Sequence, residues 1–64
     1  AAHTIEHNGK HYTLRDVNSF ITTYTKRAEE ARKLKNEDVL RARLEMVSYW
    51  QSRREELLQV MQLA

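Results

Sequence analysis

Apolar side chains recur at every third or fourth position between Leu14 and Leu34. The regularly spaced residues are Leu14, Val17, Ile21, Tyr24, Ala28 and Ala31. This spacing places them on one face of a helix and is typical of the seam along which two helices pack. Thr13 precedes the pattern and can cap the helix, and Asp16 can complete a capping box with it. The sequence therefore predicts a helix over residues 14–34.

A second apolar pattern follows Asn36 in a different phase. Extending the first seam beyond Ala31 would put charged residues such as Lys35 and Glu45 on the apolar line, which disfavours one uninterrupted helix. Asn36 is a good N-cap, and two acidic residues follow it, as suits the positive end of a helix. We therefore expect a second helix over residues 37–62, antiparallel to the first. Its main apolar stripe comprises Leu40, Leu44, Val47, Trp50, Leu57 or Leu58, and Met61.

The N-terminal segment carries the pattern of a β-hairpin. Gly9 is the only glycine, and it follows Asn8 in the dipeptide most typical of a two-residue hairpin turn. Such a turn pairs Ile5 with Tyr12 on one face, where they must pack on another element, because a lone hairpin is marginal in water. The predicted fold is mainly α: a short hairpin over residues 3–13, then an antiparallel pair of helices.

The length of the chain limits its stability. A single domain of 64 residues buries only about 60% of the surface that its unfolded chain exposes. Small domains usually add disulfides, a metal or a partner subunit, and this sequence has no cysteine. We therefore expect the helical pair to self-associate, most simply as a homodimer, into a helical bundle resembling a coiled coil. No apolar run is long enough to span a bilayer and no secretory pattern opens the sequence, so we expect a cytoplasmic protein.

The second helix has more apolar positions than one partner helix can cover. Val39, Ala42, Met46 and Tyr49 form a stripe beside the main one. Uncovered apolar area of this kind usually marks an interface. The sequence thus predicts a non-enzymatic protein-interaction or assembly module acting through the apolar and aromatic face of this helix. The predicted contact residues are Val39, Ala42, Arg43, Met46, Tyr49, Trp50 and Arg53.

Individual residues of that face differ in their expected roles. Trp50 continues the main stripe, so we assign it to the seam within the chain, and we assign Tyr49 to the interface. Aromatic side chains and arginine are favoured interface anchors. Arg43 and Arg54 fall on or beside the apolar line, where each either extends its charged head to water or pairs with a carboxylate of a partner.

The sequence offers no motif for catalysis, a cofactor or a metal. Its hydroxyl residues stand outside nucleophile motifs, and no glycine-rich loop could cradle phosphate. His3, His7 and His11 are spaced by four, but the hairpin places His11 on the opposite face from the other two. We therefore expect neither an enzyme nor a metal protein.

Binding of nucleic acid is an alternative function. Lys26, Arg27, Lys33 and Lys35 on or after the first helix could contact phosphates. Glu29 and Glu30 interrupt this run, and the second helix is slightly acidic, which suits an antiparallel pair better than a polyanion-binding surface. We therefore rank a small nucleic-acid-associated regulator below a protein-binding module.

A further alternative comes from a resemblance. The stretch from Thr4 to Tyr24, less than half of the chain, resembles the hairpin-then-helix segment of small phage head–tail joining proteins. The resemblance rests on the Asn8-Gly9 turn and the helix that follows, and the long second helix departs from that pattern. It implies a phage-type structural adaptor.

Overall fold

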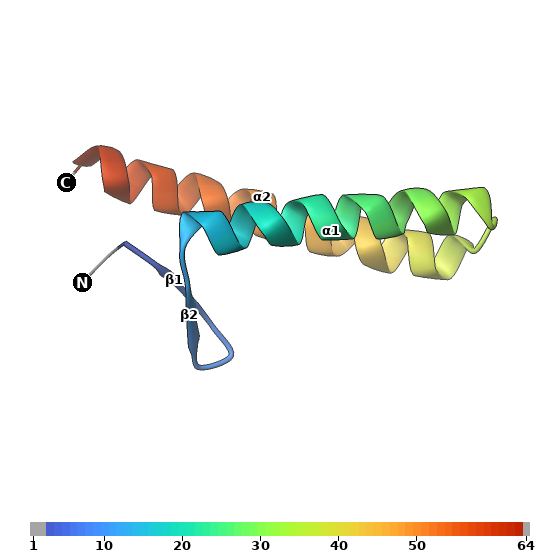
Figure 1. Ribbon diagram of the computed structural model, residues 1–64, viewed down its shortest axis with the longest axis horizontal. Helices are drawn as coiled ribbons and strands as arrows, with labels where there is room; N and C mark the ends of the chain where they lie inside the picture. Colours follow the sequence, from blue (N-terminus) through green and yellow to red (C-terminus); the bar gives the residue numbers. More distant parts are fainter. Residues whose placement is uncertain (1–2, 64) are drawn as a thin grey trace.

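The computed structural model describes residues 3–63, and within them the predicted order of elements is confirmed (Figure 1). Strands β1 (Ile5–His7) and β2 (Lys10–Tyr12) form a hairpin, followed by helices α1 (Leu14–Lys33) and α2 (Glu37–Leu63). The element ends lie within a residue or two of the predicted ones. No helix in the described part of the chain is long and apolar enough to cross a membrane.

The hairpin has the predicted register. Ile5 pairs with Tyr12, Glu6 with His11 and His7 with Lys10. Asn8 and Gly9 both have positive φ angles, of 53° and 81°. These are the angles that a type I′ turn requires, and its twist matches that of the strands.

Helix α1 begins at the predicted capping box. The Asp16 amide donates a 3.2 Å hydrogen bond to Thr13 Oγ1, and the Thr13 amide donates one of 3.0 Å to Asp16 Oδ2. These two bonds satisfy amides that have no partner within the helix, and they hold the hairpin directly against the first helical turn.

Helix α1 ends in a Schellman motif built without glycine. The amide of Lys35 donates to the Arg32 carbonyl at 3.1 Å, and the amide of Asn36 donates to the Ala31 carbonyl at 3.0 Å. Lys35 takes the left-handed conformation that this motif needs, with φ 59°. Asn36 then caps α2 by accepting a bond from the Val39 amide at 3.3 Å. The chain can therefore reverse direction within three residues.

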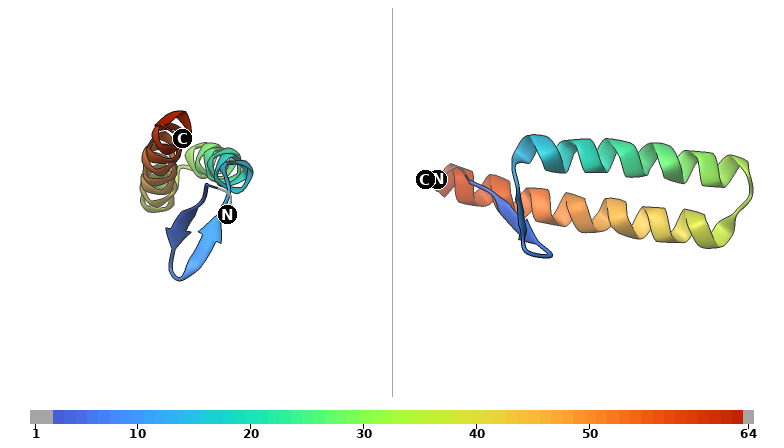
Figure 2. Two further views of the ribbon diagram at one scale, coloured as in Figure 1. Left: turned by 90° about the vertical axis from the view of Figure 1, so that its left-hand side faces the viewer. Right: turned by 60° about the horizontal axis from the view of Figure 1, so that its bottom comes forward.

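The two helices lie antiparallel, and the hairpin covers only one end of them (Figure 2). The core consists of Ile5 from β1, Val17 from α1, and Trp50 and Leu57 from α2. It lies at the hairpin end of the helical pair. At the turn end, around residues 34–36, the buried side chains of α1 are two small ones, Ala28 and Ala31.

The seam of α2 differs from the predicted stripe. Trp50 and Leu57 are buried, but Leu44 and Met61 are 50% and 40% exposed. Trp50 and Leu57 are seven residues apart, so the same line passes through Arg43 one heptad earlier. Leu44 therefore lies to one side of the seam. Helix α2 is apolar on several faces, and its narrow contact with α1 buries only one of them.

Candidate functional site

The predicted contact residues on α2 divide into a covered and an uncovered group. Trp50 is only 3% exposed and belongs to the core, which confirms its assignment to the seam within the chain. Tyr49 and Arg53 are half-buried beneath the hairpin. Among the remaining four, Val39 and Ala42 are exposed, and Arg43 and Met46 are half-buried. The hairpin thus occupies the part of the predicted face that carries its aromatic residues.

Tyr49 is held by His7 of β1. The Tyr49 hydroxyl and His7 Nδ1 share a hydrogen bond of 2.7 Å, and the two ring centres are 5.1 Å apart. His7 also packs edge-on against Trp50 at 5.0 Å. The hairpin register places His7 on the same face as Ile5 and Tyr12. That shared face was the signal of its role in packing.

Arg53 caps the free edge of the hairpin. In a two-residue hairpin His7 and Lys10 exchange hydrogen bonds, so the carbonyl of Glu6 points outward from β1. Arg53 Nη2 donates to this carbonyl at 3.0 Å, and its guanidinium lies 6.0 Å from the centre of the Tyr49 ring. An open strand edge invites pairing with another chain. Arg53 therefore closes an edge within the chain, whereas the sequence predicted an intermolecular contact.

The two arginines on the α2 seam have different surroundings. Arg54 Nη1 donates to Asn18 Oδ1 of α1 at 3.2 Å, so its partner is an amide of the same chain. Arg43 is half-buried and lines a surface hollow with Ala31, Leu34 and Val39 at the turn end.

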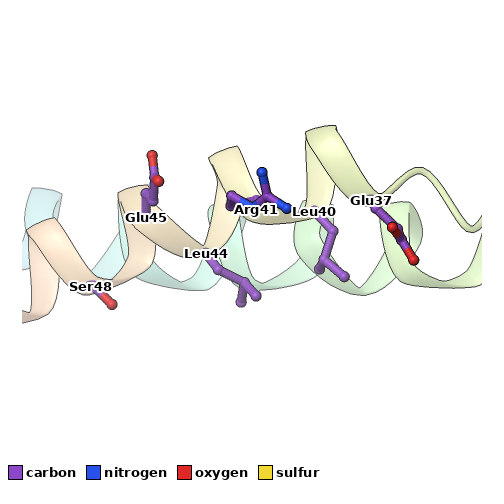
Figure 3. A pocket seen from close by; sticks show the side chains of 6 residues that line it. All are labelled: Glu37, Leu40, Arg41, Leu44, Glu45 and Ser48. Atoms are coloured by element: carbon purple, nitrogen blue, oxygen red, sulfur yellow. The ribbon is translucent and has the colours of Figure 1, made fainter.

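A partly exposed apolar strip lies on α2, across the seam from Tyr49 and Arg53. We call Leu40, Leu44 and Val47 the Leu44 strip. It borders a groove of about 350 Å³ whose α1 wall includes Thr25, Ala28, Glu29 and Arg32. Figure 3 shows Leu40 and Leu44 side by side, while Arg41 and Glu45, which line the same hollow, point toward its other edge. Leu44 is half exposed although it lies between two half-buried apolar residues.

The four basic residues proposed as phosphate contacts are all exposed, on α1 and in the turn after it. Nearby, Arg32 donates two hydrogen bonds to the Glu29 carboxylate. These bonds hold the pKa of Glu29 below its ordinary value and raise the pKa of Arg32. One cation of this helix is therefore already neutralised by its neighbour, which weakens the positive field along α1.

The three histidines have different surroundings. His3 and His11 are exposed, and His11 Nδ1 is 3.4 Å from Thr4 Oγ1, whereas His7 packs against α2. Among residues 3–63, no three side chains of histidine, aspartate or glutamate gather as metal ligands would.

The Leu44 strip is therefore a partly exposed apolar feature of α2 that is flanked by charges of both signs, and Val39, Val60 and Met61 are exposed elsewhere on the helix. Comparisons with protein-family models, with curated proteins and with solved structures give no match for this chain.

Proposed function

We propose that this protein is a non-enzymatic assembly module that self-associates through α2. The observation that carries the proposal is the half-exposed Leu44, flanked by Leu40 and Val47 on a well-formed helix. Three neighbouring apolar side chains on one face are more typical of a helix–helix contact than of a solvated surface.

The thinness of the molecule supports the same proposal. Its backbone measures 44 × 22 × 14 Å, so the helical pair is a single layer except where the hairpin lies against it. Stable domains usually pack two layers around one core. At the turn end the buried side chains of α1 are Ala28 and Ala31, which are small and bury little apolar surface. A second helical layer over the Leu44 strip would complete that end as a four-helix bundle.

The position of the aromatic residues revises the expected contact surface. Trp50 and Tyr49 pack against the hairpin and are not available to a partner. We therefore place the proposed contact on the strip across the seam of α2. Val39 and Ala42, which are exposed near the turn end, lie across the seam from the strip and fall outside the proposed contact.

Solution mass across a concentration series tests the proposal. We expect the mass from light scattering or sedimentation to rise from one chain toward two between about 10 µM and about 1 mM. Leu44→Glu should keep the protein monomeric, with its helix content unchanged. Val60→Glu is the matched control, because Val60 is 52% exposed on α2 but lies outside the strip. Wild-type protein that stays monomeric throughout the series would contradict the proposal, as would equal effects of the two variants.

A further inference from the structure

The charges beside the Leu44 strip alternate along α2. Glu37, Arg41 and Glu45 follow one another at intervals of four residues and line the same hollow as Leu40 and Leu44. On a helix, residues four apart lie on one side, about 6 Å apart along the axis. Figure 3 shows Arg41 and Glu45 pointing to one edge of this hollow and Glu37 pointing to the side of the leucines, so one positive and one negative side chain border the strip together.

We propose that the occupant of the strip is a second copy of this chain, which docks antiparallel with its own Leu44 strip. This inference rests on the proposed self-association and specifies its geometry. The two-fold axis would cross α2 midway between Leu40 and Val47, beside Leu44. Each Leu40 then faces Val47 of the second copy, and the two Leu44 side chains meet within about 1.5 Å along the helix axis.

The same axis brings opposite charges together. Arg41 lies two and a half residues to one side of the axis, and Glu45 lies one and a half to the other. An antiparallel copy therefore places its Glu45 within about one residue, ~1.5 Å, of the level of Arg41. Because the contact is isologous, the pair forms twice. Arg41 and Glu45 lie on the same side of the strip, so both pairs form along one border (Figure 3).

Other arrangements of two copies conflict with these charges. A parallel pair in register places Arg41 beside Arg41 and Glu45 beside Glu45. An antiparallel pair centred on Arg41 sets the two arginines together and Glu37 against Glu45. Like charges placed opposite each other disfavour these alternatives. A single two-fold axis thus brings the two apolar strips together and also pairs Arg41 with Glu45, as a self-complementary surface requires.

Charge reversal tests the register. Arg41→Glu and Glu45→Arg should each raise the self-association Kd about tenfold, because each sets two like-charged pairs against each other. An equimolar mixture of these two variants should form a heterodimer, and the double variant R41E/E45R should self-associate like the wild type. Glu55→Lys, another exposed position on α2, is the control and should leave the Kd unchanged.

The outcomes separate this inference from the function on which it rests. If the wild type associates and Leu44→Glu abolishes association, but the mixture and the double variant fail to restore it, the antiparallel register is wrong while self-assembly stands. Changes of less than about twofold in the single variants would equally overturn the register. A wild type that remains monomeric overturns both. Circular dichroism of every variant verifies that the helices persist.

Discussion

Trp50→Ala is the most demanding test of the core at the hairpin end. The indole is 3% exposed and contacts aromatic rings from three other elements. The ring centres of His7, Tyr12 and Phe20 lie 5.0, 5.8 and 4.8 Å from it. No other side chain in the described residues joins the hairpin to both helices through so many rings. Its removal should therefore release the hairpin as well as loosen the helical pair.

The expected loss is large compared with the total stability. A buried tryptophan removes roughly 150–250 Å² from water, or about 4–6 kcal/mol at ~25 cal/mol per Å². Residual compactness of the unfolded chain lowers this figure, and measured truncations of buried aromatic residues give about 3–5 kcal/mol. A 64-residue chain has a total free energy of unfolding of roughly 3–10 kcal/mol. Trp50→Ala should thus remove about a third of the stability or more.

Urea unfolding followed by far-ultraviolet circular dichroism, at one fixed protein concentration, measures the effect. Trp50→Phe is an informative partner variant, because it keeps a ring and removes an indole N–H that is buried without a hydrogen-bond acceptor. It should cost about 1–2 kcal/mol. Val60→Ala, at a half-exposed site, should cost about 0.5 kcal/mol or less. A loss below about 1 kcal/mol for Trp50→Ala would refute the description of this core.

Four further changes probe the local structure. Gly9→Val forces a β-branched residue to a φ of 81° and should cost about 1–2 kcal/mol in thermal unfolding, and unchanged stability would argue against the turn. Lys35→Gly relieves a left-handed residue and should raise stability by up to ~1 kcal/mol, whereas a loss would contradict the Schellman motif. Tyr49→Phe removes the hydroxyl bonded to the β1 histidine and should cost about 0.5–1.5 kcal/mol without changing solution mass. Arg32→Ala should raise the pKa of Glu29 toward its ordinary value in an NMR titration. The wild-type pair stabilises the fold at neutral pH, and that small contribution should vanish as the pH falls through the lowered pKa.

The bounds of the strands and helices could be predicted from the sequence, because the rules that place them are local. The Asn8-Gly9 turn, the Thr13–Asp16 box and the change of helical phase after Ala31 each depend on residues close together in the chain. The assignment of Trp50 to the interior also followed, because the residue lies on the seam of α2. The Schellman motif at Lys35 was not predicted from the sequence, because the usual marker of this motif is glycine.

Which faces of α2 are covered could not be predicted from local sequence and depends on long-range packing. This helix is apolar on several sides, so its sequence permits more than one buried line. The choice depends on the side to which the hairpin folds, and that follows from contacts such as His7 with Tyr49, 42 residues apart in the chain. Arg53 was turned inward to the Glu6 carbonyl by the same packing, and Leu44 was left half exposed. Periodicity identifies the apolar sides of a helix, but long-range packing selects the side that remains for a partner.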